Sequence, residues 1–191
     1  MMDKENTMKL LTVMGPPSAG KTSVLLHLTR MLRACASLRS GLLKFGDHHD
    51  EEAACIRQGM PLLTGLSAET GRGDCCLSAL DEALQWAEST YLDLLAVESV
   101  VSDERNAALT APTVFVADCL ASAPFSCLLP DGAELVAVTK GDLVSRAARE
   151  TFIGELRKRN PRANVVSVNG VTGQGTASLL RQLRFREIDT P

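Results

Sequence analysis

Eight consecutive residues, from Gly15 to Thr22, have the types and the spacing that hold a phosphate group. They read G-P-P-S-A-G-K-T and match the pattern G-x-x-x-x-G-K-[ST]. The glycines allow the backbone to curl round an anion, so that backbone N–H groups and the N-terminus of a following helix face it. We expect Lys21 to reach the β- and γ-phosphates of a nucleotide and Thr22 to ligate Mg²⁺. The alternative is an ordinary glycine turn, which the strand before the loop and the helix after it disfavour. The predicted phosphate contacts are Gly15, Ser18, Ala19, Gly20, Lys21, Thr22 and Ser23.

A second polar segment, Thr139 to Asp142, follows an apolar run and has the chemistry of a base-reading loop. It reads T-K-G-D, similar to the [NT]-K-x-D loop of GTPases. Guanine presents two parallel donors, N1–H and the 2-amino group, and the carboxylate of Asp142 can accept from both. Adenine lacks that pair, and a charged hydrogen bond is worth roughly 1.5–3 kcal/mol, or about tenfold to a hundredfold in discrimination. We predict that Thr139, Lys140 and Asp142 read guanine, with the stem of Lys140 over the base; the alternative is a solvated turn.

A third loop, 167–175, follows the last apolar run. It reads S-V-N-G-V-T-G-Q-G and resembles the S-A-x-T-G-x-G loop that closes over the base in many GTPases, with Asn169 where Lys is common. We expect Ser167, Val168 and Asn169 to contact the base, with backbone N–H groups of the loop directed at the guanine O6. Alone this is only a glycine-rich loop, but its place as the third motif in order supports the other two.

Short apolar runs alternate with helical patterns along the chain, and each of the three loops follows such a run. The apolar runs predict strands at 9–14, 42–45, 92–97, 113–117, 135–138 and 165–168. The helical patterns predict helices at 21–37, 51–57, the later part of 74–91, 145–159 and 176–184. Near-continuous apolar strands are typical of a parallel sheet with helices on both faces. We therefore predict an α/β three-layer P-loop NTPase fold with a mostly parallel central sheet, whose ligands lie at the carboxyl ends of the strands.

Length and composition indicate one soluble globular domain, 1–191, with a short polar tail at 1–8. The 191 residues are 45% hydrophobic and 23% charged. The net charge of −3 gives no basic excess for nucleic acid or an anionic membrane surface. No apolar run approaches the roughly 20 residues of a membrane span, and the polar, acid-bearing start is unlike a signal peptide. Without a secretion signal, the six cysteines predict reduced thiols and a cytoplasmic protein.

The order of these motifs resembles that of the nickel-insertion GTPases of hydrogenase and urease maturation, HypB and UreG, which belong to the SIMIBI class of P-loop GTPases. The resemblance extends over nearly the whole chain and includes G-D at 46–47 and V-E-S at 97–99. It implies that Asp47 lies near Mg²⁺ and that Glu98 lies beside Mg²⁺ and the attacking water. The alternative is that both acids are solvated residues at strand ends. The implied catalytic residues are Lys21, Asp47 and Glu98, and the implied Mg²⁺ residues are Thr22, Asp47 and Glu98.

An adjacent cysteine pair, Cys75 and Cys76, lies in a segment similar to the metal-binding loop of the same family. Residues 70–77 read T-G-R-G-D-C-C-L, just before a predicted helix. Thiolates favour Zn²⁺, Cu(I) or nickel over Mg²⁺. One pair cannot complete a tetrahedral site, but two pairs across a twofold axis can. The resemblance thus implies a nickel or zinc site at a homodimer interface; the alternative is two plain thiols.

Two departures from the family pattern bear on function. Val100 and Val101 replace the Gly that a loop sensing the γ-phosphate usually needs, and Cys76 replaces a His. We expect a slowly hydrolysing, GTP- and GDP-binding metallochaperone or maturation factor that delivers or gates nickel or zinc for a client. Its expected partners are a second copy, in a nucleotide- or metal-dependent homodimer, and a client apo-metalloenzyme or an accessory maturation protein. The alternative is a metal-free nucleotide switch that regulates the assembly of a partner enzyme. A small-molecule kinase lacks support, because no Arg-rich lid follows the phosphate loop.

Overall fold

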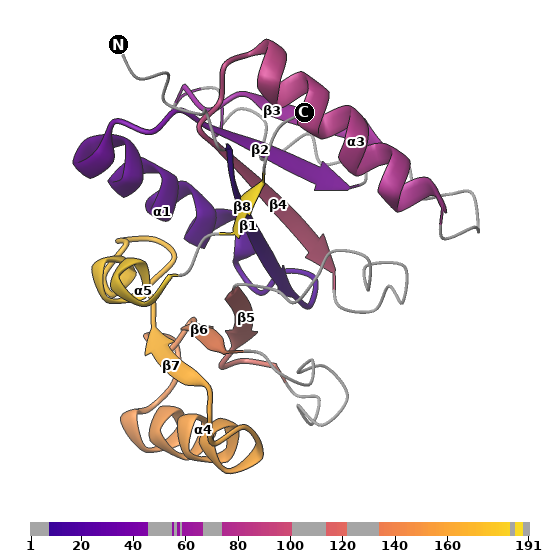
Figure 1. Ribbon diagram of the computed structural model, residues 1–191. Coiled ribbons are helices and arrows are strands. Elements are labelled where there is room, and N and C mark those ends of the chain that lie inside the picture. Colours follow the sequence, from indigo (N-terminus) through magenta and orange to yellow (C-terminus); the bar gives the residue numbers. More distant parts are fainter. Residues whose placement is uncertain are drawn as a thin grey trace.

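The computed structural model describes residues 8–45, 55, 57, 59–66, 74–100, 114–121, 134–183 and 186–188 (Figure 1). Most of the helix predicted at 51–57 lies outside these residues, and so does Asp47. The three predicted ligand loops at 15–22, 139–142 and 167–175 are all described.

One sheet forms the centre of the molecule. Within the described residues, seven parallel strands run in the order β3-β2-β4-β1-β5-β6-β7. The strands are β1 (Met8–Gly15), β2 (Ser40–Phe45), β3 (Leu62–Leu66), β4 (Leu94–Val100), β5 (Val114–Asp118), β6 (Leu135–Thr139) and β7 (Asn164–Ser167). A short strand, β8 (Arg186–Ile188), pairs antiparallel with the start of β1. The predicted mostly parallel sheet is confirmed.

The topology places a switch point of the sheet at the carboxyl end of β1. This strand lies between β4 and β5, so the chain winds outward from it in both directions. Ligands of open parallel sheets bind at such a switch point, outside the carboxyl ends of the strands. The phosphate loop follows β1 directly, at that point.

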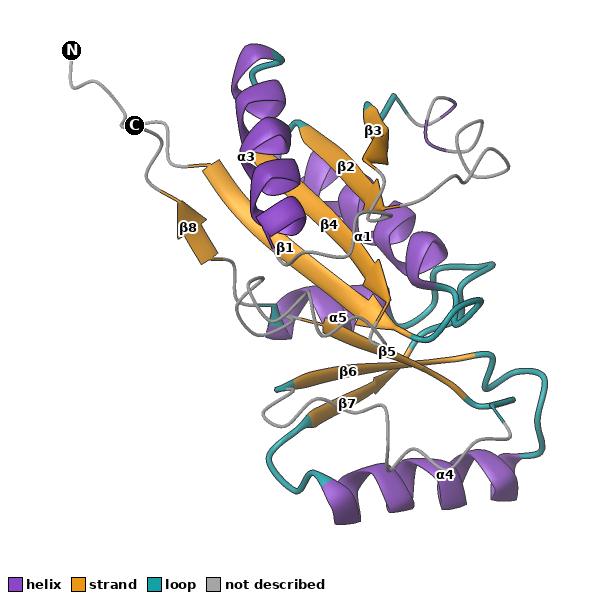
Figure 2. Cartoon of the chain, turned by 90° about the vertical axis from the view of Figure 1, so that its right-hand side faces the viewer, coloured by secondary structure: helices purple, strands orange, loops and turns teal. Residues whose placement is uncertain are grey.

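Helices cover both faces of the sheet and produce the three layers. They are α1 (Lys21–Ala36), α3 (Asp74–Ser89), α4 (Arg146–Arg159) and α5 (Thr176–Gln182). Leu11 and Val13 of β1 share a core with α1 and α5, whereas Met8, Leu10 and Met14 share cores with α3 and α4. Figure 2 shows α1 and α3 on opposite sides of β1, β2 and β4. Both faces of β1 are therefore buried, which explains why its sequence is apolar almost without interruption.

Two strands and one helix start differ from the sequence prediction. β3 was missed, because its five residues follow a proline and contain a glycine, which read as a loop. β8 was missed because three residues carry no periodic signal. The helix expected to begin after the cysteine pair begins at Asp74, so Cys75 and Cys76 lie in its first turn. The apolar spacing of Leu77, Leu80 and Leu84 marks the helix only from its first leucine onward, so the turn before it carried no periodic signal.

No helix within the described ranges has the length and apolar character needed to cross a membrane.

Candidate functional site

The phosphate loop needs glycine at two positions, at Gly15 for lack of space and at Gly20 for its backbone conformation. A Cβ on Gly15 would lie 2.4 Å from the carbonyl oxygen of Val116 on β5, so no other residue fits without moving the sheet. Gly20 has a φ of 86°, in the left-handed region that favours glycine. The loop then enters α1 at Lys21.

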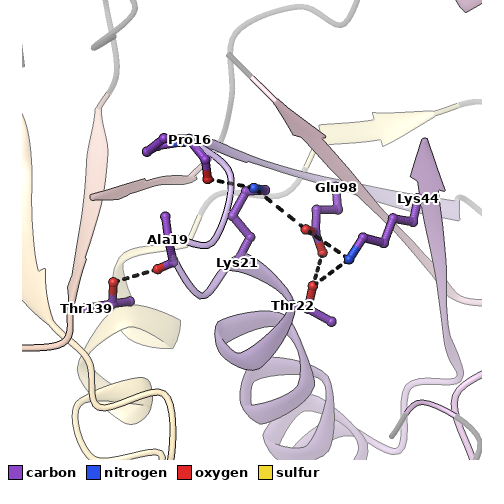
Figure 3. A network of polar contacts seen from close by, with 7 residues as sticks. All are labelled: Pro16, Ala19, Lys21, Thr22, Lys44, Glu98 and Thr139. Atoms are coloured by element: carbon purple, nitrogen blue, oxygen red, sulfur yellow. Dashed lines mark hydrogen bonds and ion pairs between the residues drawn. The ribbon is translucent and has the colours of Figure 1, made fainter. Parts of the chain in front are cut away.

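Lys21, Thr22 and Glu98 form a buried polar cluster at the start of α1 (Figure 3). Thr22 Oγ1 donates to Glu98 Oε2 at 2.5 Å. Lys21 Nζ donates to the Pro16 carbonyl at 2.9 Å and lies 3.8 Å from Glu98 Oε1. All three side chains are about 5% exposed. The structure thus brings together the predicted phosphate lysine, the predicted Mg²⁺ hydroxyl and the predicted acid at the end of β4.

Burial lowers the pKa of Lys21 below the ordinary value of a lysine. Desolvation is the largest cause, the negative charge of Glu98 opposes it, and the positive charge of Lys44 adds to it. A phosphate group entering the loop would bring the negative charge that a desolvated ammonium needs. The electrostatics of the loop therefore favour an anion.

Lys44 belongs to the same cluster and was not found by sequence reasoning. Its Nζ donates to Thr22 Oγ1 at 3.0 Å and lies 3.5 Å from Glu98 Oε1. Strand pairing sets Lys44 of β2 directly opposite Glu98 of β4. A signal was present in the sequence: Lys44 lies two residues after the core residue Leu42 and hence on the same face of the strand.

Thr139 joins the phosphate loop to the base-reading loop. Its hydroxyl donates to the Ala19 carbonyl at 2.6 Å and also lies 3.1 Å from the Ala117 carbonyl. The side chain is fully buried, at 1% exposure. The sequence predicted a contact between Thr139 and the base; what the geometry adds is a direct tie between the two loops.

Lys140 is held by a second residue that sequence reasoning missed, Asp118 at the end of β5. The Lys140 ammonium and Asp118 Oδ2 are 2.5 Å apart. Asp118 also accepts from the Leu120 N–H at 2.7 Å, which fixes its carboxylate. The ion pair orients the aliphatic stem of Lys140, while Asp142 beyond it is exposed and open to a ligand.

The third loop folds on itself around Asn169. The side-chain oxygen of Asn169 accepts from the N–H groups of Val171 and Thr172, each at 2.9 Å. The backbone N–H groups of Val168 and Asn169 donate to carbonyls within the protein, those of Val138 and Gln174. These two N–H groups are thus already used, whereas exposed Ser167 is at the edge of the loop.

The third loop also rests on α1. His27 Nε2 lies 3.0 Å from the Gly170 carbonyl oxygen. A Cβ on Gly170 would lie 3.3 Å from that of Ser23, in the first turn of the same helix. The helix that begins at the phosphates therefore supports the loop predicted to cover the base.

Two parts of the predicted metal chemistry lie outside the described residues: Asp47 and the thiol groups of Cys75 and Cys76. In the part of the chain that is described, no group of three or more His, Cys, Asp or Glu side chains converges as a metal site. The Thr22 hydroxyl and the Glu98 carboxylate are oxygen donors of the kind Mg²⁺ prefers, and they meet beside the phosphate loop. These donors fit Mg²⁺ held together with a phosphate.

Several solved structures have a similar fold. HypB from Archaeoglobus fulgidus superposes with a TM-score of 0.59 at 17% identity, over 93% of this chain and 89% of that one. HypB from Helicobacter pylori, in complex with nickel, gives 0.63 at 13% identity, over 92% and 85%. The signal recognition particle receptor FtsY from Elizabethkingia anophelis, in complex with GDP, gives 0.62 at 16% identity, over 95% and 65%. These likenesses confirm the predicted fold, an α/β P-loop NTPase fold with a parallel central sheet.

Sequence comparison gives two further results. No protein-family model matches the chain. The uncharacterized protein MJ0120 of Methanocaldococcus jannaschii is 30% identical over 184 residues, which cover 92% of this chain and 77% of that protein. The chain therefore belongs to the same family as MJ0120.

Proposed function

We propose that this protein is a cytoplasmic GTP-binding switch that hydrolyses GTP slowly. The observation that carries the proposal is the bond from Thr139 to Ala19, which ties the loop suited to phosphates to the loop suited to a base. A ligand with phosphates at one end and a base at the other fits the order of these groups. The likeness in fold to FtsY from Elizabethkingia anophelis, which was solved in complex with GDP, supports the same conclusion.

Guanine is the proposed base because of the acid in the T-K-G-D loop. In this loop Thr139 is buried and Lys140 is ion-paired with Asp118. Asp142 is exposed, so its carboxylate can accept from the two parallel donors of guanine. The stem of Lys140, oriented by Asp118, lies over the base. Ser167, Val168 and Asn169 close the far side, with contacts to the base made by groups other than the Val168 and Asn169 N–H groups, which already donate to protein carbonyls.

Hydrolysis is proposed to depend on the buried cluster. Lys21 holds the β- and γ-phosphates, Glu98 positions the attacking water, and Thr22, Glu98 and Asp47 serve Mg²⁺, which neutralises phosphate charge when bound. Val100 and Val101 stand where a glycine would let the backbone approach the γ-phosphate. We therefore expect slow turnover, which suits a switch whose states must last long enough for a partner to recognise them.

Nickel or zinc is the proposed cargo, delivered to or gated for a client metalloenzyme. The proposal is supported by the likeness in fold to HypB from Helicobacter pylori, which was solved in complex with nickel, and by the thiol pair, Cys75 and Cys76, at the start of α3. In a homodimer two such pairs supply four thiolates, enough for a tetrahedral site. If GTP favours that dimer, the metal must favour the GTP-bound dimer to the same degree. The slow hydrolysis expected from the valine pair also favours the second candidate, a switch without metal.

The test is an anaerobic metal titration with and without GTP and Mg²⁺, read by metal analysis and by equilibrium sedimentation. We expect one tightly bound nickel or zinc per two chains, and a 5- to 150-fold gain in metal affinity with GTP, the usual range of coupling between two sites. Cys75→Ser and Cys76→Ser should each lose the metal. Cys35→Ser is the matched control, since Cys35 is an exposed cysteine on α1. A wild type that binds GTP but stays monomeric and metal-free leaves the metal-free switch as the function.

A further inference from the structure

Lys44 is a second lysine, besides Lys21, in the polar cluster beside the phosphate loop. Lys44 and Glu98 are directly opposite on neighbouring strands, and both side chains are 5% exposed. Leu42 and Ala96, two residues earlier on each strand, belong to the core under α1. Because side chains alternate along a strand, Lys44 and Glu98 face α1 and the phosphate loop. Figure 3 shows the Lys44 ammonium beside Thr22 and Glu98.

The Thr22 hydroxyl is shared between Glu98 and Lys44. A hydroxyl has one proton and two lone pairs. Thr22 Oγ1 gives its proton to Glu98 Oε2 and accepts from Lys44 Nζ at 3.0 Å. The Lys44 ammonium thus lies against the threonine oxygen that ligates Mg²⁺ in other P-loops.

The two lysines approach one carboxylate from different elements. Lys21 comes from α1 and Lys44 from β2, and their Nζ atoms lie 3.8 and 3.5 Å from Glu98 Oε1. The three side chains carry two positive charges and one negative charge. An anion in the loop would meet two ammonium groups where a standard P-loop offers one lysine and depends on Mg²⁺ for the rest of the charge.

We propose that Lys44 is a second phosphate-binding lysine, and that it supplies part of the counter-charge usually supplied by Mg²⁺, so that triphosphate binding here depends only weakly on the divalent cation. The inference rests on the nucleotide site proposed above, but on neither its guanine preference nor the cysteine pair. The competing explanation is that Lys44 only neutralises Glu98 and never meets the phosphates.

The test measures affinity by calorimetry for two probes, inorganic triphosphate and GTP, each with saturating Mg²⁺ and with EDTA. Wild type, Lys44→Met and Lys44→Gln are compared; methionine keeps the length of the side chain and removes the charge, and glutamine keeps a polar end in case methionine prevents folding. Lys158→Met is the matched control, because Lys158 is an exposed lysine at the end of α4. Melting curves confirm that each variant is folded.

We expect the wild type and Lys158→Met to lose less than about tenfold in affinity when Mg²⁺ is removed. The Lys44 variants should lose about 10- to 100-fold more than that, the equivalent of one charged hydrogen bond to phosphate. Equal Mg²⁺ dependence in wild type and Lys44 variants would overturn the proposal and assign Lys44 to Glu98 alone. A protein that binds inorganic triphosphate as tightly as GTP would refute the proposed base contacts, and the triphosphate measurements would still decide the role of Lys44.

Discussion

The phosphate end and the base end of the site differ in burial and in how their charges are held. At the phosphate end, Lys21, Lys44 and Glu98 are buried together beneath the first turn of α1. At the base end, Asp142 is exposed and Lys140 is about one-third exposed. A phosphate has the same shape in every nucleotide, so a rigid, desolvated cluster can be built for it. A base must enter and be distinguished, so its readers stay open to solvent.

The two ends should also respond differently when a charge is removed. Removing one member of a buried group of paired charges is strongly destabilising, because the remaining charge is left desolvated and unpaired. Removing an exposed charge changes stability little and costs mainly its contact with the ligand. Substitutions at the phosphate end should therefore change binding of every nucleotide, whereas those at the base end should change the preference among nucleotides.

The largest effect is expected from Lys21→Ala. Removing this ammonium takes away the contact with the β- and γ-phosphates, and we expect a loss of about 100-fold or more in GTP affinity, the upper range for a charged hydrogen bond. Calorimetry with GTP and with ATP measures it, and both should fall alike. Lys158→Ala is the control. A folded Lys21→Ala protein that binds GTP as the wild type does would show that the loop holds no phosphate.

Asp142→Asn should instead exchange one base for another. The amide offers one acceptor and one donor where the carboxylate offers two acceptors, and xanthine carries a carbonyl where guanine carries its 2-amino group. We expect GTP affinity to fall by about 10- to 100-fold and xanthosine triphosphate affinity to rise. The fold should be unchanged, since Asp142 is exposed. Equal affinity of the wild type for ATP and GTP would refute the base reading at once.

The sequence predicted the phosphate loop more completely than it predicted the residues that contact the loops from neighbouring strands. The P-loop pattern combines a glycine turn, a lysine and a threonine in one short segment, so the phosphate loop could be located from spacing alone. Lys44 and Asp118 carry no such local pattern, because their roles come from strand neighbours distant in the sequence. β3 and β8 were missed for the related reason that short strands are specified by pairing partners more than by their own residues.

Thr139→Val should weaken the connection between the two ends. Valine has nearly the same shape but no hydroxyl, and leaves the Ala19 carbonyl without that donor. We expect a loss of about 1–3 kcal/mol in the free energy of unfolding, the usual cost of an unsatisfied buried polar group. GTP affinity should fall by less than in Lys21→Ala. Thr139→Ser keeps the hydroxyl and serves as the control; urea titration measures stability, and equal stability of the Val and Ser variants would mean that the bond contributes little.

The smallest effect concerns Cys119, which follows Asp118 beside the base-reading loop. Burial raises the pKa of the Cys119 thiol, the negative charge of Asp118 raises it further, and Arg149 opposes the shift. Only the thiolate is alkylated, so a raised pKa means that the rate at Cys119 stays low near neutral pH and increases only above the usual range of a cysteine.

Asp118→Asn removes the second of these causes while leaving the burial of Cys119 in place. The pKa of the thiol should fall part of the way, and the alkylation profile should move to lower pH. Iodoacetamide labelling of the Cys119 peptide, followed by mass spectrometry over a pH series, measures the shift, and exposed Glu134→Gln is a control for net charge.

Asp118→Asn also frees the Lys140 ammonium from its partner and should weaken GTP binding mildly, because only the orientation of the stem is lost. An unchanged profile together with unchanged GTP affinity would mean that Asp118 is not the anchor of the base end. Among the described residues, the phosphate end would then be the part of the site that buried charges organise.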